Sequence, residues 1–251
     1  MIAAPAAADA IACARRLQRL RVGLHLVLVE GWPMLPPDRL PDLLDRSGRF
    51  RTDIARLGLD IFARPRVRAQ VRAEIEAQFE AFAATGLALD HVNAHKHFHL
   101  HPTIASEIIA VGRRHGLRGL RVPVEPVSVL AKIEPKAGRG LMQFTAPWAK
   151  LLARRARHAG LRVPDAVFGL AWSGAMTSTR LAGLLDHLPP GCTEIYLHPA
   201  TGGGFEGQAP GYRYADELAA LLAPSSRAAA SRPDITLGGY ADLVSPGPVS
   251  S

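Results

Sequence analysis

Short apolar segments alternate with amphipathic helical patterns along most of the chain. Strands are expected at residues 20–29, 91–102, 117–123, 166–171, 193–199 and 235–243. Alternation of this kind favours a parallel sheet or a (β/α) barrel, in which the carboxyl ends of the strands carry the chemistry. Five side chains suited to catalysis or binding fall at or near such ends: His25, His95, Arg121, Trp172 and His198.

The helix with the clearest periodicity is predicted at residues 66–85. Gly86 follows it, where a helix commonly ends, and the apolar positions recur at helical spacing. These positions are Val67, Val71, Ile75, Phe79 and Phe82. Residues 30–64 are expected to form a long irregular excursion. Other helices are expected at residues 3–17, 103–115, 144–158, 177–188 (capped by Thr177) and 215–222.

Length and composition fit one large α/β domain. The chain has 251 residues, of which 48% are hydrophobic, enough to bury a full-sized core. We expect a single domain over residues 1–244 and a disordered tail over 245–251. Cys13 and Cys192 lack CxxC partners, which argues against a disulfide framework or a zinc knuckle and favours a reducing, cytoplasmic setting.

The net charge of +8 comes largely from arginines scattered along the chain. Such a charge could favour nucleic acid or anionic membranes, but no nucleic-acid motif accompanies it, and a high-GC coding sequence produces the same composition. No apolar run reaches the ~18 residues of a membrane span. We therefore expect a soluble protein without a nucleic-acid partner. The basic helix at 144–158 either lies at a lipid interface or packs on a sheet with a solvated face.

Residues 91–102 contain five of the ten histidines. If this run is a β-strand, side chains alternate, so that the histidines and Asn93 share one face. Neutral imidazole is a common ligand for divalent metals, and a strand end that projects several imidazoles can supply part of a coordination shell. The alternative is a His-rich turn, or a set of core histidines and histidines that only orient ligands.

Hydrolysis of an amide would use such a site. The reaction needs a Lewis acid to polarise the carbonyl, a base for the attacking water and an acid for the departing amine. His25 and His95, on neighbouring predicted strands, are candidate metal ligands, and His198 is the candidate acid. Taken alone, His25 in its apolar segment also fits a core residue.

Three motifs, at residues 23–26, 91–99 and 197–200, resemble those of the YdjC-like carbohydrate deacetylases. The sequences of four longer segments resemble the subgroup associated with hopanoid biosynthesis, HpnK. These segments are residues 22–31, 90–102, 168–177 and 194–201. The resemblance implies an α/β fold, namely a deformed (β/α) barrel of the glycoside hydrolase/deacetylase type. It also implies a metal-dependent N-deacetylase acting on N-acetylglucosaminyl bacteriohopanetetrol, with peripheral contact at the inner membrane.

The resemblance assigns roles by motif. His25 and His95 match the metal histidines, and His198 matches a candidate acid. Arg121, Trp172 and Ser173 fall where substrate contacts are expected, and Asn93 and His97 would orient the ligands. The implied cofactor is a divalent metal, Mg or Zn foremost. The sequence predicts no oligomeric state.

Two departures from the family pattern stand out. Asn93 occupies a position where many relatives carry Asp. The Asp-Asp-Phe-Gly strand that opens the family, and supplies its base and carboxylate ligand, has no counterpart here, so we expect the first barrel strand to be missing. The alternatives are then an impaired or non-catalytic metal-binding remnant, or another metal-dependent hydrolase.

Overall fold

The computed structural model describes residues 1–137 and 142–243. They form two compact units, each described by itself below. Unit 1 comprises Met1–Arg121, Leu152–Val163 and the segment from Gly239, and unit 2 comprises Val122–Leu151 and Pro164–Gly238. The single domain over residues 1–244 stays a prediction, and the tail 245–251 lies outside the described residues.

Parallel strand pairing forms the centre of unit 1. Strand β1 (Val22–Leu26) pairs in parallel with β2 (Leu89–Ala94), and the register sets His25 beside Asn93. On the other side of β2, Val92 bridges Leu120 in parallel, and Gly119 in turn bridges Arg162. The predicted strand at 117–123 therefore contributes single bridges rather than a full strand.

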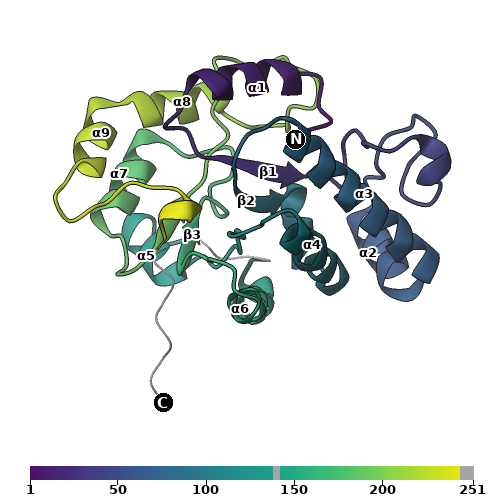
Figure 1. The fold of residues 1–251 in the computed structure, drawn as a ribbon. Coiled ribbons are helices and arrows are strands. Elements are labelled where there is room, and N and C mark those ends of the chain that lie inside the picture. Colours follow the sequence, from purple (N-terminus) through teal and green to yellow (C-terminus); the bar gives the residue numbers. More distant parts are fainter. Residues whose placement is uncertain (138–141, 244–251) are drawn as a thin grey trace. The chain divides into compact units, whose positions relative to one another are not determined.

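Helices cover this pairing. In Figure 1, α3 (Pro65–Ala84) runs beside α4 (Pro102–Arg114), and α3 also packs against α2 (Ile54–Ala63) and β1. The helical elements assigned to unit 1 are α1 (Ala7–Arg16), η1 (Pro37–Arg39), α2 (Ile54–Ala63), α3 (Pro65–Ala84), η2 (His95–Leu100), α4 (Pro102–Arg114) and η3 (Tyr240–Asp242), and α6 (Met142–His158) contributes to both units. No helix in the described ranges is long and apolar enough to cross a membrane.

Helix α3 confirms the predicted periodicity. All five predicted apolar positions are buried. Pro65 begins the helix, where a missing N–H costs nothing, and Gly86, with a φ of 71°, follows its end. The sequence pattern did not reveal that a polar row on the same helix, Gln70, Glu74 and Gln78, is buried as well.

This polar row bonds the backbone of the segment that follows β1. Gln78 accepts a hydrogen bond from the Val27 amide at 3.0 Å and donates one to the Val27 carbonyl at 2.7 Å. Glu74 accepts from the amides of Met34 and Leu35 at 2.8 and 3.0 Å. Burial raises the pKa of the Glu74 carboxyl above its ordinary value, although these hydrogen bonds favour its charged form.

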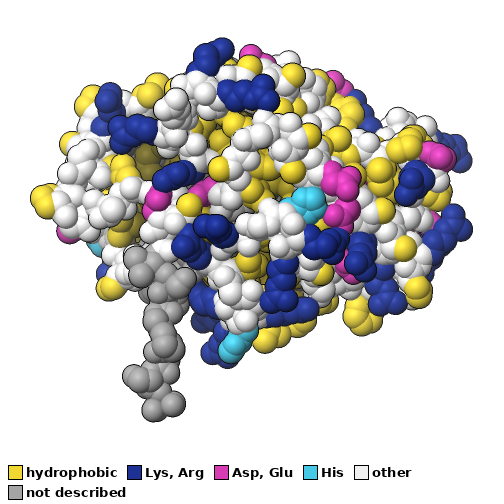
Figure 2. Space-filling view, viewed as in Figure 1, with side chains coloured by type: hydrophobic (Ala, Val, Ile, Leu, Met, Phe, Trp, Pro, Cys, Tyr) yellow, Lys and Arg dark blue, Asp and Glu magenta, His cyan; other side chains and the backbone are white. Residues whose placement is uncertain are grey.

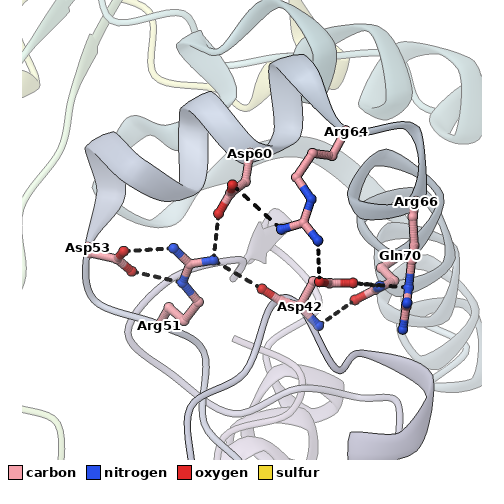
Figure 3. Close-up of polar contacts among 7 residues, drawn as sticks. All are labelled: Asp42, Arg51, Asp53, Asp60, Arg64, Arg66 and Gln70. Atoms are coloured by element: carbon pink, nitrogen blue, oxygen red, sulfur yellow. Dashed lines mark hydrogen bonds and ion pairs between the residues drawn. The ribbon is translucent and has the colours of Figure 1, made fainter.

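Charged pairs attach the rest of the 30–64 segment to α2 and α3 (Figure 3). Arg51 bonds Asp53 at 2.7 Å and Asp60 at 2.9 Å, and Arg64 bonds Asp42 at 2.9 Å. The predicted irregular excursion is thus wrong for its second half, which contains α2. The apolar positions Leu57 and Ile61 of that helix are four residues apart and both buried.

Unit 2 contains a second parallel pair, β3 (Ala166–Phe168) with β4 (Thr193–Ile195). Its helices are α5 (Val127–Ile133), α7 (Ser178–Asp186), α8 (Tyr214–Leu222) and α9 (Pro224–Ala230), and α7 packs against the other three. The Thr177 cap is confirmed, because its hydroxyl accepts from the Arg180 amide at 3.3 Å.

Two further strand predictions are wrong, one in part and one in full. The strand from His91 ends at Ala94, because Lys96 and His97 both have a φ of 53°, which turns the chain into η2. Residues 235–243 form no strand. Their backbone amides at Tyr240 and Ala241 instead bond the Asp90 carboxylate at 3.0 and 2.9 Å. The described strands form two parallel pairs in a mixed α/β fold, and a closed barrel is not seen among them.

Replacement of Gln78 by Leu should leave both backbone groups of Val27 buried without a partner. We expect the free energy of unfolding to fall by about 1–3 kcal/mol for such a loss. Urea denaturation measures the change. Glu80→Ala, an exposed site on the same helix, is the control and should be near neutral. Equal stabilities for Gln78→Leu and the parent protein would contradict this role.

Replacement of Asp90 by Asn removes one of the two oxygens that accept the amides at 240 and 241. Burial raises the pKa of Asp90, but hydrogen bonds from His91, Ala241 and Tyr240 outweigh it, so that the folded pKa lies below the ordinary value. The carboxylate therefore stabilises the fold above the unfolded pKa of about 3.9, and this contribution disappears as pH falls through the lower folded pKa.

We expect the Asp90→Asn substitution to cost about 1–3 kcal/mol at pH 7, and the difference between the two proteins to shrink at about pH 3. Urea unfolding at both pH values checks this. A deficit that is the same at both would show that the lost interaction is not that of the ionised carboxylate.

Candidate functional site

Two imidazoles lie side by side at the carboxyl end of the β1–β2 pair. His25 is near the end of β1, and His95 is the first residue after β2. Their ring centroids are 5.7 Å apart and the rings are nearly perpendicular, at 73°. Burial lowers the pKa of His25 well below its ordinary value, so His25 is neutral at pH 7. The structure thus brings together the two predicted metal ligands.

Asn93 connects this pair to the next segment of the sheet. Its amide lies 2.5 Å from Nδ1 of His25 on one side. On the other side it lies 2.8 and 3.3 Å from Nη1 and Nη2 of Arg121. Arg121 is held in place by its own amide, which donates to the Val92 carbonyl at 3.0 Å. Its predicted role as a substrate contact stays a prediction.

Glu30 is a neighbour of the pair that the sequence analysis missed. Its Oε2 lies 3.0 Å from Nζ of Lys96 and 4.0 Å from Nε2 of His95. Glu30, Lys96 and His97 all have positive φ values, between 51° and 53°. Such strain in residues other than glycine clusters at functional sites. The signal available in the sequence was a lone carboxylate directly after the apolar run at residues 20–29.

His91, another histidine of the 91–102 run, contacts residues that support the fold rather than the His25–His95 pair. Its ring stacks on Tyr240, with centroids 4.3 Å apart, and Nδ1 lies 2.9 Å from Asp90. A Cβ at Gly23 would stand 2.6 Å from the His91 ring, which explains why a glycine lies just before the first metal-ligand candidate.

The remaining three histidines do not continue the predicted alternation, because the strand has ended. His99 is completely buried, which lowers its pKa to about 3 and leaves it neutral. His101 lies with Nε2 3.1 Å from the Gly58 carbonyl. The His97 ring lies 6.1 Å from that of His99. The prediction of one shared imidazole face is wrong, and the ligand-orienting role of His97 stays a prediction.

A divalent metal, implied by the resemblance, finds suitable donors in His25 and His95. Neutral imidazole suits zinc and related ions. Across residues 1–137 and 142–243, no group of three or more His, Cys, Asp or Glu side chains gathers closely enough to hold a metal ion. The donors therefore fit a metal in kind, but they are fewer than the three or four protein ligands that zinc sites normally use.

His198 of unit 2 sits among aromatic rings. Its ring makes edge contacts with Tyr196 and Tyr212, at centroid distances of 5.6 and 5.0 Å. Glu217, a buried residue that the sequence analysis missed, accepts a hydrogen bond from the His198 amide and one from the Met176 amide at 3.0 Å. One carboxylate thus fixes the backbone at His198, and its Oε2 lies 3.9 Å from the His198 Nδ1.

Trp172 and Ser173 have different surroundings. The Trp172 ring is buried in the core of unit 2, and its Nε1 donates to Glu134 at 3.1 Å. Ser173 Oγ lies 2.7 Å from the Tyr212 hydroxyl, which places Ser173 near the ring that contacts His198. Their predicted substrate contacts stay predictions.

A carboxylate of unit 2 also supports the turn after β3. Glu125 accepts hydrogen bonds from the amides of Gly169, Leu170 and Ala171, at 2.9 to 3.0 Å. Burial raises the pKa of the Glu125 carboxyl, against the effect of these bonds. Gly169 has a φ of 123° and lies against the Tyr196 carbonyl, so a side chain there would clash.

Known proteins similar to this chain have related names. The carbohydrate deacetylase of Geobacillus stearothermophilus is 27% identical over 198 residues, which cover 78% of this chain and 64% of the relative. The carbohydrate deacetylase of Mus musculus is 29% identical over 264 residues, which cover 96% and 84%. The match to the carbohydrate deacetylase of Brevibacillus brevis spans 41% of that protein. The chain thus spans less than two thirds of some relatives that it matches.

A solved structure has the same fold. It is a crystal structure of a protein from Enterococcus faecalis V583 with a proposed role in cellobiose-phosphate cleavage, and it superposes with a TM-score of 0.71 at 23% identity. The superposition covers 96% of this chain and 85% of the other. Because the model of the YdjC-like protein family matches residues 1–232, the chain belongs to that family.

Proposed function

We propose that this protein is a metal-dependent N-deacetylase that removes acetate from an N-acetylglucosamine-type sugar. The observation that carries the proposal is the pair of neighbouring imidazoles, His25 and His95, at the ends of two parallel strands. Membership of the YdjC-like family, with relatives named carbohydrate deacetylases, supports the same reaction.

The proposed reaction adds water to the acetyl carbonyl carbon. The C–N bond breaks, the nitrogen takes up a proton, and acetate and a free amino sugar result. A divalent metal, Zn or Mg, would polarise the carbonyl and acidify the water when bound. His25 and His95 would hold it through neutral ring nitrogens, a state that the burial of His25 favours.

His198 is the proposed acid for the departing nitrogen. Its backbone is fixed by Glu217, and its ring has defined aromatic neighbours. A positioned histidine typically contributes about 10²–10⁴-fold to such a proton transfer. Arg121, Trp172 and Ser173 are the proposed contacts for the sugar, although the Trp172 ring packs in the core of unit 2.

The finer proposal concerns the substrate. Likeness to the HpnK subgroup favours N-acetylglucosaminyl bacteriohopanetetrol, an amino-sugar hopanoid, and a deformed (β/α) barrel. A lipid substrate of this kind would bring the enzyme from the cytoplasm to the inner membrane as a peripheral protein. The rival proposals are another metal-dependent hydrolase and a non-catalytic metal-binding protein, which would take up a metal without turnover.

Removal of the His95 imidazole should abolish turnover. We expect the protein to release acetate from N-acetylglucosaminyl bacteriohopanetetrol with added Zn²⁺ or Mg²⁺, and His95→Ala to reduce kcat/KM by at least about 10²-fold. Quantification of acetate and of the free amine measures this. His187→Ala, an exposed histidine directly after helix α7 of unit 2, is the control and should keep full activity.

The outcomes separate the rival functions. Release from a simple N-acetyl sugar but not from the hopanoid would reject the hopanoid substrate and keep the deacetylase. Metal uptake without acetate release from either substrate would favour the non-catalytic protein. Activity retained in His95→Ala would reject the proposed site.

Helix α6 provides a surface suited to membrane contact. Trp148 and Leu151 are 45% and 54% exposed, and the basic residues Lys150, Arg154 and Arg155 are exposed on the same helix. Aromatic and apolar side chains flanked by cations are typical of interfacial helices. Elsewhere, basic side chains occur at many places on the visible face (Figure 2).

Charge reversal on α6 tests this contact. Arg154→Glu together with Arg155→Glu should release the protein from anionic vesicles, because each basic residue near the surface contributes about 1 kcal/mol. Co-sedimentation with phosphatidylglycerol vesicles measures binding. The double control Arg16→Glu, Arg19→Glu changes net charge equally at exposed sites. An equal loss in both doubles would show non-specific attraction instead.

A further inference from the structure

The Asn93 amide lies between one group that can donate or accept a hydrogen bond and one that can only donate. On one side is Nδ1 of His25 at 2.5 Å, and a neutral imidazole nitrogen either donates or accepts there. On the other side is the Arg121 guanidinium, which only donates and never accepts. An amide has one accepting oxygen and one donating NH₂, so its orientation decides whether Nδ1 of His25 donates or accepts the hydrogen bond.

Only one orientation satisfies Arg121. With the oxygen toward Arg121, it accepts from Nη1 at 2.8 Å and from Nη2 at 3.3 Å, and the NH₂ donates to Nδ1 of His25. With the oxygen toward His25, the NH₂ would face the guanidinium, so that donors face donors. The first orientation makes all three hydrogen bonds in a site where Asn93 is 7% exposed, and buried polar groups without partners are costly.

We propose that Asn93 is a positioning residue that holds His25 in the tautomer with its proton on Nε2. Nδ1 must then carry a lone pair, because it accepts from the Asn93 amide. A neutral ring has one N–H, which therefore sits on Nε2. In the metal-free protein Nε2 of His25 thus carries a proton and donates a hydrogen bond, whereas coordination of a metal through Nε2 requires a lone pair on that nitrogen.

The inference deepens the proposed function and rests on it, because it sets the affinity of the same two-histidine site. Ligation through Nε2 of His25 requires the proton to move to Nδ1 and the Asn93 amide to turn, which would set its NH₂ against Arg121. Asn93 therefore weakens metal binding at His25. Ligating histidines normally have the reverse arrangement, in which the second nitrogen donates to a carboxylate or carbonyl.

A carboxylate of the same size removes the conflict. Aspartate at position 93 accepts from Nδ1–H of His25 through one oxygen and from Arg121 through the other. It would stabilise the tautomer whose Nε2 is free for a ligand. The second probe is Arg121→Met, which removes the cation that orients the amide, so that either amide orientation becomes available.

The first experiment determines the tautomer in the metal-free protein. Long-range ¹H–¹⁵N NMR spectra of ¹⁵N-histidine-labelled protein at pH 8, assigned with His25→Gln, report which nitrogen carries the proton. We expect Nε2–H in the parent protein, Nδ1 protonated in Asn93→Asp, and a mixture in Arg121→Met. A proton on Nδ1 of His25 in the parent protein would overturn the proposal, as would a tautomer that does not change in Asn93→Asp.

The second experiment measures metal affinity by titration calorimetry with Zn²⁺. Asn93→Asp should bind at least about tenfold more tightly than the parent protein, in the range of effects known for residues that orient ligands. His95→Ala in the Asn93→Asp background should lose that gain. Equal affinities in the parent protein and Asn93→Asp would overturn the inferred effect on binding. Neither readout uses acetate release, so failure of the proposed function would leave the tautomer result standing.

Discussion

Buried backbone amides and carbonyls must find partners, and in this protein short strands leave many of them to side chains. The described strands contain three to six residues each, so the backbone groups of the loops that follow them have few strand neighbours with which to form hydrogen bonds. Polar side chains on neighbouring elements bond these loops instead. Gln78 pairs both backbone groups of Val27, and Glu125 receives three consecutive amides after β3. The loops that follow the strands, where chemistry is expected, are thereby held by side-chain hydrogen bonds.

The same device explains which parts of the fold were predictable. Helix α3 was predictable because its apolar side chains repeat with the helical period and need no partner beyond one another. From the sequence alone, the adjacent row with Glu74 and Gln78 looks like a solvent-exposed face. The residue type does not reveal whether a polar side chain bonds a distant loop or water. The end of β2 at Ala94 was missed for another reason. Lys96 and His97 adopt a left-handed conformation, and neither is a glycine, the residue that usually indicates such a turn in a sequence.

The candidate site divides in a similar way. Residues near the same end of adjacent parallel strands are close in space, so the proximity of His25 and His95 followed from two motifs and a parallel sheet. The contact of Asn93 with Arg121 depends on a third segment whose register no local pattern specifies. Glu30 was hidden because its position depends on a strained backbone. The candidate metal ligands were thus easier to predict from the sequence than the residues that surround and orient them.

Three residues around His95 hold a left-handed backbone that costs roughly 1–2 kcal/mol each for a residue with a Cβ atom. Glu30, Lys96 and His97 are therefore the places where glycine would be tolerated most readily, and where an engineer seeking a more heat-resistant protein would look first. The turn that begins at Lys96 also carries the chain away from β2 directly after His95. Glycine at Lys96 or His97 would keep this turn, because glycine adopts a positive φ without steric cost, so a gain in thermal resistance there is compatible with the placement of the His95 imidazole.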